Sequence, residues 1–117
     1  MEYLFVNDAT PDDSIEILNQ VIDRHPERKD RVRILTHEQN KGLPAARNNG
    51  LAEAKGEYVF HCDSDDFVET DMLQDMYDKA IAEDTDIVYS DYLLSFEKSA
   101  KHMKQPSYDT PMQALRG

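Results

Sequence analysis

The sequence predicts an α/β fold with a mostly parallel sheet covered by helices. Short apolar runs alternate along the chain with amphipathic helical patterns, in the order β-α-β-α-β-α-β. The 117 residues are enough for one domain with a modest core. Acidic clusters directly follow the first and third apolar runs. Open α/β sheets bind ligands beyond the carboxyl ends of their strands, so this placement favours a binding site at one edge of the sheet.

Two strands and two helices are expected in the first half of the chain. Residues 3–6 form an apolar run that ends in Asn-Asp, which is typical of a buried strand. Residues 10–25 place apolar side chains on one helical face. Residues 31–38 alternate in polarity like a strand with one exposed face, and residues 44–56 predict an alanine-rich helix that can pack closely.

The second half continues the alternation and then loses it. Residues 57–62 predict a third strand, residues 69–84 an amphipathic helix and residues 86–94 a fourth strand. We expect residues 1–94 to form the core domain. Residues 95–117 are polar and predict a tail that is mostly loop.

Composition excludes several classes of protein. The formal net charge is −11, from 24 acidic and 13 basic residues, which argues against nucleic acid as a partner because phosphate binding needs a basic face. The single cysteine, Cys62, cannot form a disulfide within the chain and fits a reducing compartment. No apolar stretch approaches the ~20 residues that cross a bilayer. We therefore expect a cytoplasmic protein, or one that is peripheral at the membrane.

Three carboxylates crowd the end of the third expected strand. Asp63, Asp65 and Asp66 lie within four positions, and such like charges are unfavourable unless a cation neutralises them or they take up protons. Oxygen ligands suit Mg²⁺ or Mn²⁺, which proteins commonly hold through one or two carboxylates together with substrate phosphates. A metal that carries a phosphate-bearing ligand is therefore the expected occupant. The four histidines show no zinc-ligand spacing.

Two segments resemble family 2 glycosyltransferases with the GT-A fold. "YLFVNDATPDDSIEILNQV" resembles the family's "VDDGSTDxS" segment, and "HEQNKGLPAARNNGLAEAKGEYVFHCDSDDFVETDMLQDMY" resembles its "NxGxxxARNxGLxxAxGEYxxxxDSDD" segment. The likeness covers roughly residues 3–92. It implies inverting transfer of a sugar from a nucleotide-diphosphate donor, most often a UDP-sugar, with Mn²⁺ or Mg²⁺. The implied acceptor is a glycan or lipid-linked hydroxyl, in glycan or cell-surface polysaccharide synthesis.

The resemblance also assigns roles to individual residues. Asp8 and Asn7 would lie near the nucleobase and ribose of the donor. Asp63 and Asp65 match the DXD motif, with Asp65 as the best candidate for the metal that bridges the diphosphate. Arg47 would approach the donor, although pairing with an acid on the helix surface is an equally good interpretation of it.

The chain departs from the family pattern in several places. Asn7 stands where an aspartate is usual, which should weaken donor recognition, and Ala9 stands where glycine is usual. The family's first strand and its general base have no counterpart, so we expect a truncated donor-binding core that self-associates through its exposed sheet edge or is marginally stable. No catalytic residue is assigned. Asp91 and Asp109 are candidates for the base by position alone.

Two alternatives remain open at this point. The first is a non-catalytic module that keeps the fold and binds nucleotide without transferring sugar. The second is a receiver-like signalling domain, which also places acidic residues at strand ends to bind magnesium. That domain needs a lysine near the end of a late strand, and none follows residue 86 before Lys98.

Overall fold

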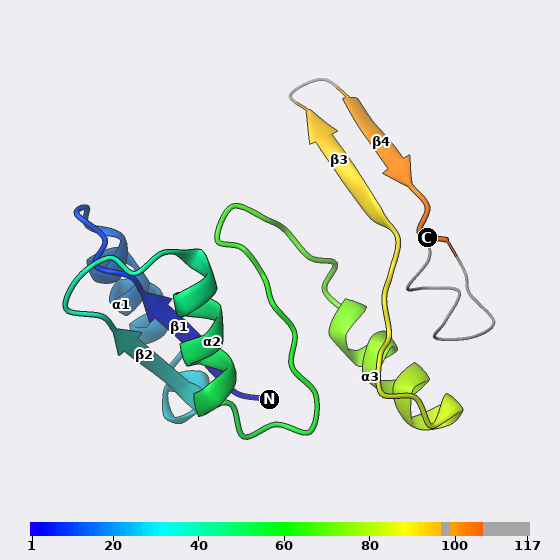
Figure 1. The fold of residues 1–117 in the computed structure, drawn as a ribbon, viewed down its shortest axis with the longest axis horizontal. Helices are drawn as coiled ribbons and strands as arrows, with labels where there is room; N and C mark the ends of the chain where they lie inside the picture. Colours follow the sequence, from blue (N-terminus) through cyan, green and yellow to red (C-terminus); the bar gives the residue numbers. More distant parts are fainter. Residues whose placement is uncertain (97–98, 107–117) are drawn as a thin grey trace. The chain divides into compact units, whose positions relative to one another are not determined.

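The computed structural model describes residues 1–96 and 99–106 (Figure 1). The chain divides into two compact units, Met1–Asp66 and Phe67–Gly117. The boundary predicted between residues 94 and 95 concerns the polar tail and stays a prediction.

A parallel pair of strands forms the centre of the first unit. Strand β1 (Tyr3–Asn7) pairs with β2 (Val32–Thr36), from Tyr3 opposite Val32 to Asn7 opposite Thr36. Helix α1 (Ser14–Arg24) and a 3₁₀ helix, η1 (Pro26–Arg31), connect them. A parallel pair needs such a crossover connection. The α/β prediction is confirmed for this β1-α1-β2 unit, with a sheet of two strands.

Helix α2 (Leu43–Glu53) runs from the carboxyl ends of the strands back to their amino ends (Figure 1). Its first end lies beside Asp8, which accepts the Gly42 N–H at 2.7 Å. Its last residue, Glu53, pairs with Arg33 near the start of β2 at 3.2 Å. A Cβ added at Gly50 would lie 3.4 Å from Val6, at ordinary contact distance, which shows that α2 packs against β1. The helix is thereby fixed to the sheet at both ends.

Residues 57–62 do not form the predicted third strand. They are irregular and exposed; Tyr58, Val59 and Phe60 keep 39%, 46% and 44% of their surface accessible. An apolar run indicates the tendency to be buried, but a strand also needs a neighbouring backbone with free donors and acceptors. In the described part of the chain this segment pairs with neither β1 nor β2. The prediction was wrong for this element.

Among its described residues, the second unit contains one helix and one hairpin. Helix α3 (Met72–Glu83) agrees with the predicted amphipathic helix. Strand β3 (Tyr92–Phe96) pairs antiparallel with β4 (Ser99–Met103), so the fourth strand predicted at residues 86–94 starts later and does not join the parallel sheet. Strands that are close in sequence pair antiparallel across a short connection, which removes the need for a crossover. The polar composition of residues 95–117 concealed β4.

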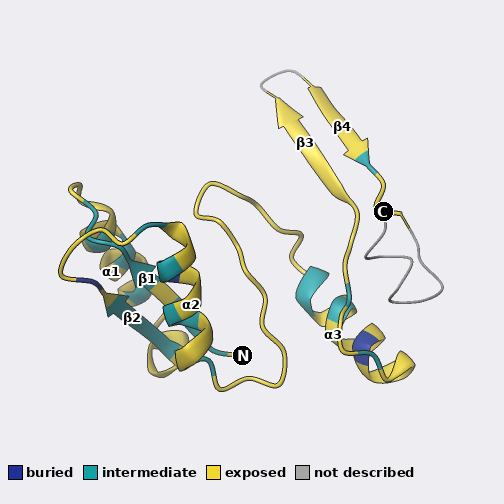
Figure 2. Ribbon diagram, in the orientation of Figure 1, coloured by how far each residue is buried: buried dark blue, intermediate teal, exposed yellow. Residues whose placement is uncertain are grey.

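Burial is sparse in both units (Figure 2). Among the described residues, Ala46, Ala80 and His37 are buried, at 9%, 2% and 8% exposure, and no large side chain is fully enclosed. His37 is therefore the one polar residue of this part of the chain that is withdrawn from water. Within residues 1–96 and 99–106, no helix is long and apolar enough to span a membrane.

Candidate functional site

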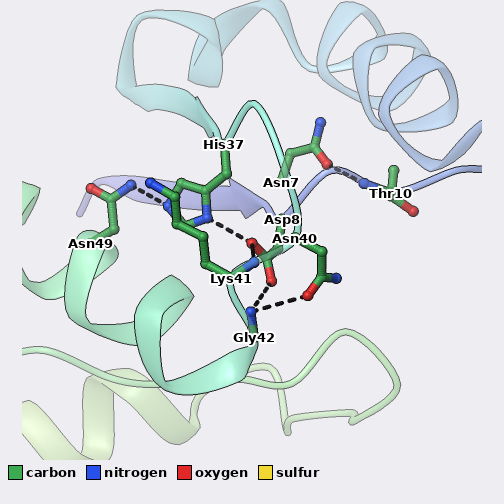
Figure 3. Close-up of polar contacts among 8 residues, drawn as sticks. All are labelled: Asn7, Asp8, Thr10, His37, Asn40, Lys41, Gly42 and Asn49. Atoms are coloured by element: carbon green, nitrogen blue, oxygen red, sulfur yellow. Dashed lines mark hydrogen bonds and ion pairs between the residues drawn. The ribbon is translucent and has the colours of Figure 1, made fainter.

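The candidate site lies beyond the carboxyl ends of β1 and β2. Asn7 and Thr36 are the last paired residues, and the His37 N–H donates to the Asn7 carbonyl at 2.9 Å. Because parallel strands end at the same edge, the next residues of the two strands, Asp8 and His37, are placed side by side. Their side chains meet at this edge (Figure 3).

Three donors hold the Asp8 carboxylate. Oδ1 lies 2.7 Å from His37 Nδ1 and accepts the Lys41 N–H at 2.8 Å, and Oδ2 accepts the Gly42 N–H at 2.7 Å. The hydrogen bond from His37, followed by the one from the Lys41 backbone, lowers the pKa of Asp8. Asp8 is therefore an ionised acceptor of fixed direction. A carboxylate has about four acceptor positions, so Oδ2 retains capacity for a donor from a ligand.

His37 was absent from the sequence-based candidates. Its ring is 7% exposed and bridges two elements, since Nδ1 contacts Asp8 and Nε2 lies 2.8 Å from Asn49 Nδ2 on α2. Screening the histidines for zinc spacing could not find it. The strand-end argument that selected Asp8 applies equally to the first residue after β2, and that signal would have found His37.

Asn7 and Ala9 shape the turn that follows β1. The Asn7 Oδ1 accepts the Thr10 N–H at 2.9 Å, so this side chain holds the turn itself. Ala9 has a φ of 58°, in the left-handed region that glycine adopts without strain. This backbone accounts for glycine being the usual residue here in the resembling family. A contact between Asn7 and the donor stays a prediction.

Gly42 closes the turn between β2 and α2 with a backbone that other residues avoid. Its φ of 85° and ψ of 163° lie in a region that is essentially restricted to glycine. Its N–H is shared between Asp8 Oδ2 and Asn40 Oδ1, the latter at 3.1 Å. The Asp8 charge lies at the N-terminus of α2, where the helix dipole favours an anion. Gly42 therefore serves the turn that leads into α2.

The acidic cluster lies on an exposed turn. The Asp66 N–H donates to the Asp63 carbonyl at 3.1 Å, which closes a four-residue turn around Asp65. Arg47 Nη2, on α2, lies 2.8 Å from Asp63 Oδ1, and both side chains are about half exposed. The structure thus brings Arg47 and Asp63 together, while Asp65 projects from the same turn. In the described residues, no group of three or more His, Cys, Asp or Glu side chains is arranged around a metal position.

Of the two candidates for the general base, Asp91 and Asp109, the structure describes Asp91. Asp91 Oδ1 accepts the Gln105 N–H at 2.8 Å, and its Oδ2 lies 2.9 Å from His102 Nε2. The Gln105 N–H, and then His102, lower the pKa of Asp91, which makes it a weaker base. Asp91 joins the two ends of the β3–β4 hairpin. Asp109 lies outside the described residues.

Acid should destabilise the first unit through Asp8. Its pKa is lowered in the folded state, so its contribution is present above the unfolded pKa and is lost as pH falls through the folded value. We expect the unfolding temperature to fall between pH 5 and pH 2, and Asp8→Asn to reduce that fall. Glu38→Gln removes an exposed carboxylate next to His37 and serves as the control. Equal acid sensitivity of Asp8→Asn and the unsubstituted chain would contradict this role.

Comparison with known proteins adds independent information. The family model described as "Glycosyl transferase family 2" matches residues 1–115. The chain is 37% identical over 95 residues to "Cholesterol galactosyltransferase" of Borreliella burgdorferi and 39% identical over 93 residues to "Glycosyltransferase GlyG" of Streptococcus pneumoniae. It is 34% identical over 74 residues to "Chondroitin synthase" of Pasteurella multocida. No solved structure gives a significant match.

These matches cover most of the chain but only part of each relative. They include 81%, 79% and 63% of this chain, and 25%, 29% and 7% of the three relatives in the same order. The chain therefore spans about a quarter of the length of the first two. The family match leaves no support for the receiver-like alternative.

Proposed function

Because the chain belongs to glycosyl transferase family 2, we propose that it forms the donor-binding part of an enzyme that transfers a sugar from a nucleotide-diphosphate donor to an acceptor hydroxyl. The family has the GT-A fold, and the parallel β1-α1-β2 unit agrees with it. One observation carries the proposal. The Asp8 carboxylate is held at the carboxyl edge of the sheet by three donors and keeps an acceptor position on Oδ2.

Asp8 is suited to recognise a nucleoside. A nucleobase N–H or a ribose hydroxyl donates hydrogen bonds, and a charged acceptor makes a stronger bond than a neutral one. The lowered pKa keeps Asp8 in the accepting form. Since its orientation is fixed before the ligand arrives, little side-chain entropy remains to be lost on binding. We therefore assign Asp8 to the nucleoside end of the donor, with a UDP-sugar as the expected donor.

The acidic turn fits a divalent cation that arrives with the diphosphate. Asp63 and Asp65 offer only oxygen ligands on one exposed turn, as Mn²⁺ and Mg²⁺ prefer. Two protein carboxylates, with the other positions filled by phosphates and water, are a common arrangement for such ions. Bound there, the metal would act as a Lewis acid that stabilises the departing nucleotide diphosphate. Asp65 is the main candidate ligand, because Asp63 already pairs with Arg47.

Arg47 connects the acidic turn to the nucleotide-binding edge. It stands one turn after the start of α2, whose first end is held by Asp8 through Gly42. Its ion pair with Asp63 restrains the turn beside the helix. A guanidinium also matches the geometry of a phosphate. We propose that Arg47 positions Asp63 and contributes positive charge near the diphosphate.

The described residues assign neither the acceptor nor the catalytic base. The names of the relatives refer to cholesterol in one case and to chondroitin in another, so we propose a lipid or glycan hydroxyl as the acceptor. Inverting transfer needs a base to take the proton of that hydroxyl, and we assign none here. Nucleotide binding without transfer or donor hydrolysis would identify the non-catalytic alternative.

Calorimetric titration of UDP into the 117-residue chain tests the proposal. We expect binding in the presence of Mn²⁺ that is at least roughly tenfold tighter than binding without metal, because the ion links the carboxylates to the diphosphate. Uridine, which lacks the diphosphate, serves as the control. Its affinity should be the same with and without Mn²⁺. An absence of binding by UDP, GDP and TDP alike would contradict the proposal.

A further inference from the structure

We propose that His37 is a positioning residue for donor binding. It acts as a neutral ring with its proton on Nδ1, and this form is selected by Asn49. This inference rests on the proposed function, because the group that His37 orients is the Asp8 carboxylate assigned to the donor nucleoside. The relevant contacts are the 2.7 Å approach of Nδ1 to Asp8 and the 2.8 Å approach of Nε2 to Asn49 (Figure 3).

The partners on the two sides of the ring determine where its proton lies. The ionised Asp8 carboxylate only accepts hydrogen bonds, so Nδ1 must carry a hydrogen. The atom of Asn49 that faces Nε2 is its amide nitrogen, which only donates. Nε2 must therefore be the accepting lone pair. Both conditions are met by one form of the ring, the neutral Nδ1–H tautomer.

The other forms of the ring leave a contact unsatisfied. With the proton on Nε2, the lone pair of Nδ1 would face the Asp8 oxygen at 2.7 Å, and Nε2–H would face the Asn49 donor. In a doubly protonated ring, Nε2–H would again meet that amide. Because His37 is 8% exposed, water has little access to relieve either mismatch. Asn49 thus influences Asp8 through His37 and not through a contact of its own with Asp8.

The arrangement joins the three elements that define the edge. Asp8 follows β1, His37 follows β2 and Asn49 lies on α2. The other two donors to Asp8 are backbone groups of the turn at Lys41 and Gly42, which Asp8 itself helps to order. His37 is anchored independently, since its own N–H extends the parallel ladder to Asn7. It is the donor best placed to fix the direction of the carboxylate.

Two substitutions of His37 distinguish its hydrogen bond to Asp8 from the packing of its ring. His37→Leu removes the donor, and we expect UDP affinity in Mn²⁺ to fall at least roughly tenfold, since a hydrogen bond to a charged group is lost. His37→Asn can place an amide nitrogen near the position of Nδ1 and should recover a measurable part of that loss. His25→Leu, at an exposed histidine after α1, is the matched control and should bind normally. Circular dichroism establishes that each variant is folded.

The ring nitrogens of the unsubstituted chain give a test that does not depend on any variant folding. Long-range ¹H–¹⁵N NMR spectra at neutral pH should show His37 as the Nδ1–H tautomer. An Nε2–H or doubly protonated His37 would overturn the inference. So would unchanged UDP binding by folded His37→Leu, which would leave the proposed function intact. If the unsubstituted chain binds no nucleotide diphosphate, both the proposed function and this inference fail.

Discussion

Replacing Gly42 with alanine should lower the free energy of unfolding by about 2 kcal/mol and abolish measurable UDP binding. The φ of 85° and ψ of 163° at this position are strained for any residue that has a Cβ. Space is not the reason, because the nearest atom to an added Cβ would be a Pro44 carbon at 3.9 Å. To relieve the strain, the backbone must rotate and withdraw the N–H that holds Asp8 Oδ2. Urea unfolding and calorimetry measure the two effects.

Two variants control for the chemical change itself. Gly50→Ala makes the same substitution inside α2, where helix propensity favours alanine by up to about 1 kcal/mol and the new Cβ reaches ordinary contact with Val6. Ala9→Gly is the reverse change at a left-handed residue and should stabilise the chain by about 1 kcal/mol. If the Gly42→Ala and Gly50→Ala variants unfolded at the same urea concentration, the role proposed for the turn at Gly42 would be wrong.

The substitution Asp65→Ala should remove the whole effect of Mn²⁺ on UDP binding. Asp65 is exposed on the Asp63–Asp66 turn, so its loss should not disturb the packing of the first unit. Without it, one carboxylate remains as the main protein ligand, and that one is paired with Arg47. We expect the affinity measured with Mn²⁺ to fall to the value measured without metal. Metal-independent binding through Asp8 should stay unchanged.

Asp71→Ala is the matched control for this experiment. It removes the same charge from an exposed aspartate at the N-cap position of α3, whose side chain makes no cap hydrogen bond. Its response to Mn²⁺ should equal that of the unsubstituted chain. If Asp71→Ala lost the metal effect and Asp65→Ala retained it, the assignment of the acidic turn would be wrong.

Local patterns predicted β1, α1, β2 and α2 well because the tendency to form each of these elements resides in its own residues. The strand that ends just before Asp8, the helix after it and the second strand were all visible as apolar patterns in the sequence. The family motifs then pointed to Asp8 and Arg47, each of which makes a definite contact in the structure. Of the two interpretations of Arg47, pairing with an acid is confirmed by its contact with Asp63, and its approach to the donor stays a prediction.

Strand pairing and the contacts between side chains were harder to predict. Residues 57–62 have the composition of a buried strand, but hydrophobicity does not specify which backbone lies next to it. Strand β4 is polar, so periodicity gave no indication of the hairpin. His37 was missed because its importance comes from Asp8, 29 positions away, and from Asn49, 12 positions away. The register of the parallel pair brings Asp8 and His37 together, and the packing of α2 against the sheet adds Asn49.

The central claim is that Asp8, at the carboxyl edge of the sheet, and the Asp63–Asp66 turn bind the same complex of metal and nucleotide. Backbone amide NMR of the ¹⁵N-labelled chain tests it most directly. With UDP and diamagnetic Mg²⁺, we expect the Lys41 and Gly42 amides to shift, because their acceptor Asp8 contacts the nucleoside. Replacing Mg²⁺ with paramagnetic Mn²⁺ should broaden the amides of residues 63–66 far more strongly when UDP is present. UDP-independent broadening spread over the acidic residues, with the Lys41 and Gly42 amides unmoved, would contradict the account.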